Sequence, residues 1–242
     1  MIRLLPLLVM LLCMTTVPAT AQEVSITLGD DGSLATRSIQ LLVLITVLSL
    51  VPGIAIMVTC FPFIVTVFAI LRQAIGLQQS PPNMLIVSLA LFLTYFVMEP
   101  VFIAAWEAGI APLLEDSISI EDAFLRTMEP LRGFMSGRIA PDTFLALADL
   151  RPDVPNDTTL ADAPLSIMVP SFLLSEMERA FQVGFLIFMP FLIIDLVVAA
   201  VLMSMGMMMV PPAIVSLPFK LAFFVVADGW SLIASSLVMS YN

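Results

Sequence analysis

The chain has no histidine and few charged side chains of either sign. Charged residues make up 12% of its 242 residues, and nine Lys and Arg stand against 19 Asp and Glu. The resulting net charge of −10 has the wrong sign for binding a phosphate backbone, which argues against a nucleic-acid partner. Without histidine the chain lacks the most common general base and metal ligand, and we predict no metal and no other cofactor.

Hydrophobic residues, in contrast, account for 60% of the chain, and the mean hydropathy is +1.10. Soluble domains are about 45–50% apolar and about 25% charged. This composition is typical of a polytopic membrane protein and excludes an ordinary soluble enzyme and a disordered tail. The catalytic motifs of common enzyme families are absent from the sequence, so we predict that the protein is not an enzyme.

The first 21 residues read as a cleaved secretory signal peptide. Arg3 provides a positive start, residues 4–13 form a short apolar core, and Ala19-Thr20-Ala21 is a typical cleavage site. An uncleaved transmembrane helix and a lipoprotein signal are the alternatives. Cleavage places the short segment 22–38 outside the cytoplasm and leaves Cys60 as the one remaining thiol, so that no internal disulfide forms.

Four apolar blocks follow, at residues 39–71, 84–106, 180–205 and 213–239. The intervening region 107–179 carries 13 acidic and five basic residues and is broken by prolines into short amphipathic pieces. We therefore predict an all-α integral membrane protein with two long helical hairpins, 39–106 and 180–242, and a small acidic helical domain between them. Four crossings place this domain and both termini on the same, extracytoplasmic side, with Arg72 and Lys220 at the cytoplasmic turns.

The two predicted hairpin turns repeat one pattern, a glycine followed by four residues and then two prolines. Gly76 precedes Pro81 and Pro82 in the first turn, and the second turn has the same spacing in Gly206, Pro211 and Pro212. Glycine tolerates the left-handed backbone conformation that ends a helix, and proline is favoured at the start of the next one. We expect two helical hairpins of similar construction.

Four charged residues lie inside the apolar blocks: Glu99, Asp195, Lys220 and Asp228. A charge at the bilayer centre costs roughly 2.5–3.5 kcal/mol and is usually paired. Asp195 and Lys220 lie about 11 and about 8 residues from the second turn, so their heights differ by about 5 Å, and they can pair within the chain or between subunits. An assembly pair and a proton or ion relay are the two interpretations. Asp228, next to Trp230, is interpreted as an interfacial anchor.

The second turn is rich in methionine, with Met207, Met208 and Met209 in succession. Thioethers are ligands for Cu(I), which suggests a copper site, although no Cys or His accompanies them. Core packing is a second interpretation. A third is a deformable apolar seal, formed by such loops in an oligomer and able to close around a passing polypeptide.

Several segments resemble the FliP/SctR family of type III secretion export-gate proteins. Those that carry the resemblance are Leu71-Arg-Gln-Ala-Ile-Gly76, Ser80-Pro-Pro-Asn83, Leu89-Ala-Leu-Phe-Leu-Thr94, Ala180-Phe-Gln-Val-Gly184, Pro190-Phe-Leu-Ile-Ile-Asp-Leu196, Gly206-Met-Met-Met-Val-Pro-Pro212, Leu217-Pro-Phe-Lys220 and Asp228-Gly-Trp230. One departure is Pro62-Phe63, where many relatives have Thr-Arg.

The resemblance implies a channel-forming subunit in the bacterial inner membrane, within the flagellar basal body. Several copies form a pentamer-like ring with FliQ and FliR, near FlhB and FlhA, with FliO as an assembly factor, and the channel passes unfolded rod, hook and filament proteins. The methionine turn implies a gasket, Glu176 and Asp195 match family acidic residues, and Phe134 and Phe144 resemble subunit-contact residues. The family also implies that the apolar helices pack on partner subunits as well as on lipid.

Two other functions remain open from the sequence. One is the homologous export-gate subunit of a virulence injectisome. The other is a small secondary transporter or proton channel, for which inverted repeats and midplane charges are the usual signs.

Overall fold

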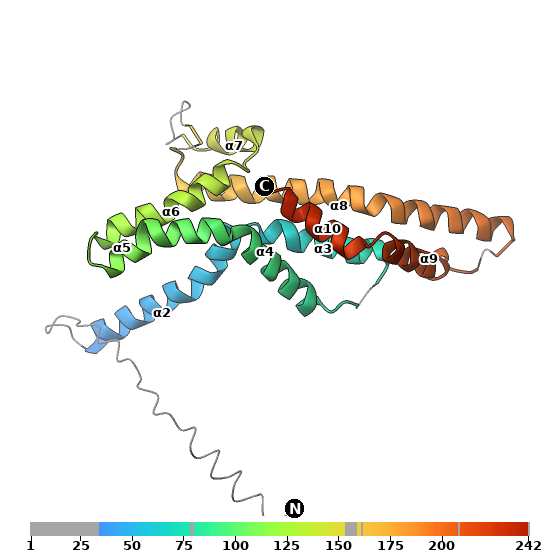
Figure 1. Ribbon diagram of the computed structural model, residues 1–242, viewed down its shortest axis with the longest axis horizontal. Coiled ribbons are helices and arrows are strands. Elements are labelled where there is room, and N and C mark those ends of the chain that lie inside the picture. The colour runs from blue at the N-terminus through green and yellow to red at the C-terminus, as the bar shows by residue number, and fades with distance from the viewer. Residues whose placement is uncertain (1–33, 78–79, 153–158, 161, 208, 242) are drawn as a thin grey trace, which may run out of the picture. The chain divides into compact units, whose positions relative to one another are not determined.

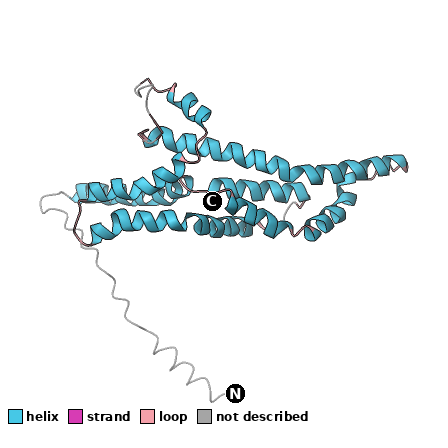
Figure 2. Ribbon diagram, turned by 45° about the horizontal axis from the view of Figure 1, so that its top comes forward, coloured by secondary structure: helices cyan, strands magenta, loops and turns pink. Residues whose placement is uncertain are grey.

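The computed structural model describes residues 34–77, 80–152, 159–160, 162–207 and 209–241 (Figure 1). Every regular element in this part of the chain is a helix (Figure 2). The predicted all-α fold is thereby confirmed. The predicted signal peptide, residues 1–21, and the segment 22–33 lie outside the described residues.

The chain divides into two compact units, residues 1–48 and 49–242, and helix α2 (Leu34–Met57) crosses the boundary between them. Side chains of α2 from Ser38 to Met57 are all exposed. The helix continues through Pro52, as helices in apolar surroundings often do. The first apolar block is instead interrupted at residues 58–60, so that it forms two helices.

Helices α3 (Phe61–Ile75) and α8 (Leu165–Ser204) form the centre of the second unit and lie side by side (Figures 1 and 2). One face of α3 is completely buried, including Phe63, Ile64 and Phe68. The close approach of the two helices depends on Gly184, where an added Cβ would lie 2.4 Å from Cδ1 of Ile70. The main apolar core therefore surrounds a helix of only 15 residues.

Helix α4 (Asn83–Ala105) continues through a π-helical turn, η1 (Trp106–Ile110), into α5 (Ala111–Leu114). Helix α6 (Ile120–Ser136) then returns along it. The contact requires Gly109, because an added Cβ would lie 2.5 Å from the carbonyl oxygen of Ala123. Part of the acidic region 107–179 is thus built directly onto the end of α4.

Helix α7 (Pro141–Ala148) packs on the first turns of α8 and completes a second, smaller core. That core contains Val58, Met135, Ile139, Phe144, Ala163, Ile167, Met168 and Phe172. Because α8 begins at Leu165, the acidic region and the second hairpin share one continuous helix of 40 residues. The predicted boundary between residues 179 and 180 falls inside that helix.

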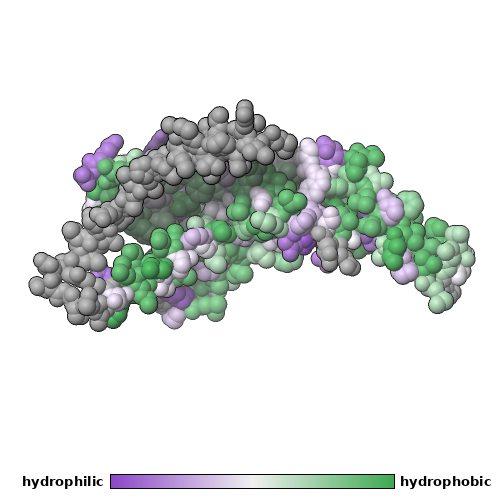
Figure 3. Space-filling view, turned by 90° about the horizontal axis from the view of Figure 1, so that it is seen from below, coloured by the Kyte–Doolittle hydropathy of each residue, from purple (hydrophilic) through white to green (hydrophobic). Residues whose placement is uncertain are grey.

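The chain ends with α9 (Pro212–Val226) and α10 (Gly229–Met239), which are bent by 60° relative to each other. Three helices of the described chain are long and apolar enough to span a membrane, and a fourth span is possible if the bent pair counts as one. Hydrophobic side chains cover much of the face shown in Figure 3. These spans confirm the prediction of about four hydrophobic helices in a membrane protein.

Candidate functional site

Both hairpin turns begin with a glycine in the left-handed conformation, with φ of 89° at Gly76 and 76° at Gly206. In each turn the residue after the glycine donates its N–H to the carbonyl five residues earlier, at 3.3 Å and 3.0 Å. Pro82 is the N-cap of α4, and Pro212 begins α9 directly after Pro211. The glycine part of the repeated pattern therefore has the same backbone geometry in both turns, whereas the following helix begins after the second proline in the first turn and at the second proline in the second turn.

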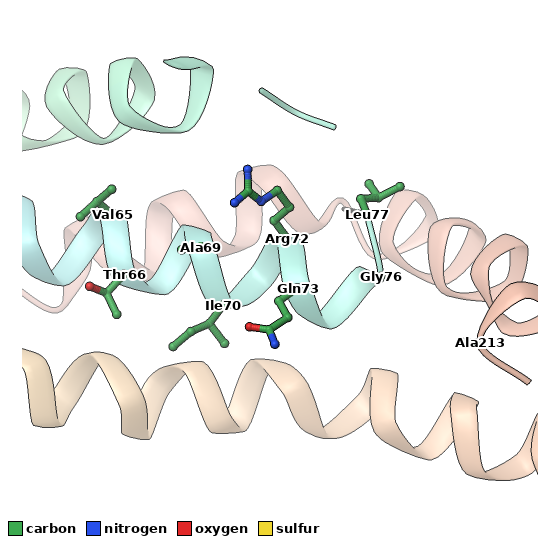
Figure 4. A pocket seen from close by; sticks show the side chains of 9 residues that line it. All are labelled: Val65, Thr66, Ala69, Ile70, Arg72, Gln73, Gly76, Leu77 and Ala213. Atoms are coloured by element: carbon green, nitrogen blue, oxygen red, sulfur yellow. The ribbon is translucent and has the colours of Figure 1, made fainter. Parts of the chain in front are cut away.

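Arg72 closes the first turn. Its guanidinium donates to the carbonyl of Pro81, at 3.4 Å, and to the side-chain oxygen of Asn83. A cavity of about 760 Å³ lies beside this end of α3, and Figure 4 shows Arg72 and Gln73 leaving the helix on opposite sides. The side chain of Arg72 thus stabilises the first turn, which the sequence predicts to lie at the cytoplasmic surface of the membrane.

The second turn exposes Met207 and Met209. The side chain of Met209 is 97% exposed and that of Met207 is 41% exposed, while Met208 lies outside the described residues. Next to the turn, an apolar groove of about 560 Å³ runs between α8 and α9 and is partly lined by Met205 and Met207. Met209 accordingly contributes nothing to the core of its own chain.

Asp195 and Lys220 form the salt bridge that their distances from the second turn predict. Nζ of Lys220 lies 2.6 Å from Oδ2 of Asp195, and the hydroxyl of Ser216 donates to Oδ1 at 2.5 Å. The Lys220 side chain is only 7% exposed, whereas that of Asp195 is 37% exposed. The ammonium is thus enclosed by protein, and the carboxylate reaches the surface.

Lys220 also connects the two hairpins. Its ammonium donates to the carbonyl of Ala74 at 3.1 Å, in the last turn of α3. The C-terminal end of a helix carries partial negative charge and unpaired carbonyl groups, which a cation stabilises. One side chain on α9 therefore holds α8 through Asp195 and α3 through its C-terminus.

Glu176 is completely buried in α8 and is the centre of a second charged cluster. Arg138, in the loop after α6, lies 2.9 Å from its Oε1, and Arg179 lies 3.6 Å from the same atom. The Tyr241 hydroxyl donates to Oε2, and the Arg138 guanidinium stacks 4.0 Å from the Tyr241 ring centre. A buried carboxylate with this many partners is well compensated.

The cluster joins the acidic region to the C-terminus. Arg138 also donates to the carbonyl of Ser240, at 2.8 Å. Burial raises the pKa of Tyr241 well above its usual range, and the negative charge of Glu176 raises it further. The phenol is thus a fixed hydrogen-bond donor to Glu176 at every physiological pH.

The two predicted subunit-contact rings lie inside the chain. Phe134 contacts Phe172 and Tyr241, at 5.8 Å and 6.0 Å between ring centres, and Phe144 is 5% exposed in the smaller core. A contact with another copy therefore stays a prediction, and the structure shows an intrachain role for both rings.

Asp228 is exposed at the bend between α9 and α10, with φ of 47°. Gly229 follows it because a Cβ there would lie 2.2 Å from the Phe224 ring. Trp230 contacts the rings of Phe68 and Phe224, at 6.1 Å and 5.5 Å. The Asp-Gly-Trp motif thus shapes the bend and packs it against α3.

The sequence pointed to Glu176, Asp195 and Lys220 but not to Arg138, Tyr241 or Ser216. Arg138 and Tyr241 are 38 and 65 residues away from Glu176 along the chain. No local sequence pattern therefore relates Arg138 or Tyr241 to Glu176. Among the residues that the structure describes, no group of three or more His, Cys, Asp or Glu side chains could hold a metal ion.

Fold and contacts together define a class: an all-α integral membrane protein in which charged side chains join helices from distant parts of the chain. Comparison with known proteins then gives the family. The FliP family profile matches residues 44–237. The chain is 52% identical to the flagellar biosynthetic protein FliP of Caulobacter vibrioides, covering 93% of this chain and 84% of the relative. The corresponding protein of Bacillus subtilis is 46% identical, covering 88% and 96%. The chain therefore belongs to the FliP family, and it is a flagellar export-apparatus component located in a membrane.

Proposed function

We propose that the protein is a channel-forming subunit of the flagellar type III export gate, through which unfolded rod, hook and filament proteins pass. The exposed methionine turn carries the proposal. Met209 makes almost no contact within its own chain, and it stands beside an apolar groove in a protein of this family. Thioether side chains are flexible and apolar, so a ring of such turns can close on itself or around a polypeptide.

The large exposed apolar surface supports a function in an assembly. None of the side chains of α2 between Ser38 and Met57 is buried, and only 11% of the most apolar window of α8 is buried. Lipid and neighbouring subunits are the two environments that cover such surfaces. We propose a homo-oligomeric, pentamer-like ring with FliQ and FliR, associated with FlhB and FlhA and assembled with the help of FliO.

We place this ring in the bacterial inner membrane at the flagellar basal body, with the acidic region and both termini on the periplasmic side. In this arrangement Glu176, Asp195 and Lys220 set the shape of each subunit and so determine how copies fit together. Asp228 contributes through the bend, and Phe134 and Phe144 act through the domain that they support. The relatives' flagellar names favour this function over an injectisome subunit.

The experiment replaces Met207, Met208 and Met209 together by alanine in the full-length chain. Because the seal loses its flexible apolar side chains, cells are expected to leak small ions and dyes at least 10-fold faster while the gate still assembles. Met84→Ala is the matched control, since Met84 is 80% exposed at the other turn. Unchanged permeability in assembled gates would remove the sealing role.

A further inference from the structure

A continuous stripe of exposed side chains runs along α4 and η1. Its members recur every three or four residues and therefore lie on one face of the helix. Five of them are apolar and at least half exposed: Phe92, Tyr95, Phe96, Ile103 and Trp106. The buried residues of α4 occupy the other face: Ile86, Ala90, Thr94, Met98 and Ala105. The stripe is rich in aromatic rings and has the width that a neighbouring helix covers.

One carboxylate lies in the middle of this stripe. Glu99 is exposed and is the only charged residue between Asn83 and Ala105. It makes no hydrogen bond or ion pair with any residue that the structure describes in this chain. A carboxylate in apolar surroundings costs roughly 2.5–3.5 kcal/mol unless a cation faces it.

The depth of Glu99 separates it from lipid headgroups. The candidate span begins at Asn83, and the acidic region begins at Glu107. At about 1.5 Å per residue, Glu99 lies about 24 Å from Asn83 and about 12 Å from Glu107 along the helix. Half the hydrocarbon thickness of a bilayer is about 15 Å. A headgroup ammonium at either surface is therefore too far along the helix to neutralise the carboxylate.

The cations of this chain are also poor partners for Glu99. Arg138 and Arg179 face Glu176, and Lys220 faces Asp195. Arg126 is exposed on α6 but stands one turn from both Asp122 and Glu129, whose carboxylates would repel another acid. With a net charge of −10, a second copy brings mostly repulsion.

We propose that the stripe is the docking face for an apolar helix of a different protein, which places one Arg or Lys side chain opposite Glu99. The aromatic rings on either side supply apolar area and a favourable surface for a cation. A single charge pair within an apolar interface sets the register of the two helices, because sliding by one turn would separate the charges. This surface is distinct from the methionine turn, and the proposal rests on the export-gate assembly proposed above but not on the sealing role of the methionines.

The experiment uses the full-length chain in its own cells, so that assembled export gates are irradiated. A photo-crosslinking amino acid is placed at Phe96 or Ile103, and the adduct is mapped by mass spectrometry. The expected adduct joins the stripe to an apolar segment of another protein with an Arg or Lys within one helical turn of the crosslink. Glu99→Gln should lower the crosslink yield about 3-fold, and Glu99→Lys at least 10-fold.

Replacing the mapped cation by Glu should restore at least half of the yield in the Glu99→Lys chain. Glu129→Gln is the matched control, since it removes an exposed carboxylate from α6 and should leave the yield unchanged. Yields are normalised to the amount of chain in the membrane. The isosteric Glu99→Gln variant still tests whether the yield depends on the charge of Glu99 if the lysine variant does not accumulate. Adducts to a second copy, adducts to lipid alone, a mapped segment without a cation, or yields insensitive to Glu99 would each overturn the proposal.

Discussion

The asymmetry of the Asp195–Lys220 salt bridge predicts unequal effects of removing its two members. In Asp195→Asn the ammonium of Lys220 loses its carboxylate partner while its side chain remains 7% exposed. Removing one partner of a buried pair typically costs about 3–5 kcal/mol, because an uncompensated charge stays buried. The retained bond to the Ala74 carbonyl offsets part of this. We expect a loss of about 3–4 kcal/mol in the free energy of unfolding.

Lys220→Met should be milder. Methionine keeps the apolar stem that packs between the helices, and the remaining carboxylate is 37% exposed. That carboxylate keeps some hydration, and it also keeps the hydrogen bond from Ser216. We therefore expect a loss of about 1–2 kcal/mol in the free energy of unfolding, which is less than for a fully buried pair because solvent screens the exposed carboxylate. The difference of about 2 kcal/mol corresponds to a roughly 30-fold change in the folding equilibrium.

The assay is unfolding of the purified, detergent-solubilised protein in a denaturant titration, followed by helical circular dichroism. The double variant Asp195→Asn/Lys220→Met completes a double-mutant cycle, in which contacting residues show a coupling energy of about 0.5–3 kcal/mol. Ser216→Ala is the control, because it leaves the salt bridge intact and should cost only about 1 kcal/mol.

A charge-swapped chain provides a second comparison. Asp195→Lys/Lys220→Asp should assemble better than Asp195→Asn, since opposite charges still face each other, but less well than the parent, because a carboxylate then replaces the cation beside the Ala74 carbonyl. If Asp195→Asn is as mild as Lys220→Met, or if the coupling energy is near zero, the ammonium does not depend on this carboxylate and the reasoning is refuted.

Three other predictions concern buried groups and close contacts. Gly109→Ala should destabilise the chain by at least about 2 kcal/mol in the same titration, because the new Cβ would collide with the α6 backbone. Gly133→Ala is its control and should be neutral or slightly stabilising, because no atom lies within 4 Å of the added Cβ. Tyr241→Phe should cost about 1–3 kcal/mol by removing the donor to Glu176. Because the pKa of Tyr241 is raised in the folded chain, its hydroxyl contributes fully to the free energy of unfolding below about pH 10, and this contribution is lost as the pH rises further. Above pH 10 the Tyr241→Phe variant should therefore lose less stability than the parent. Burial raises the pKa of Cys60 to about 12, so maleimide labelling at pH 8 should be at least 10-fold slower in the folded protein than in denaturant, with Cys60→Ala as the blank.

Local sequence patterns predicted the parts of the fold that depend on local forces. The glycine–proline repeat at the two turns predicted where helices end and begin, because both residue types act through their own backbone dihedral angles. The apolar blocks predicted membrane helices, because helix length and hydropathy are properties of a segment. The pair Asp195–Lys220 was predictable for the same reason, since a hairpin turn relates their heights.

Other features of the fold depend on contacts between segments that are far apart in the sequence. The break after α2 depends on tertiary packing, because Val58, Thr59 and Cys60 are all buried. The single helix Leu165–Ser204 joins a region that the charge pattern had divided. The contact between Lys220 and Ala74 spans 146 residues. It forms only when α9 has packed against the end of α3.

Composition and local pattern by themselves determined the class of protein, the turns of its hairpins and the candidates for buried charge, because these follow from transfer free energies and backbone preferences of neighbouring residues. Tertiary structure alone decided which charges meet. Arg138 and Tyr241 converge on Glu176 only after α6, α8 and α10 are in place, because a buried carboxylate is stable only where packing brings donors from distant segments.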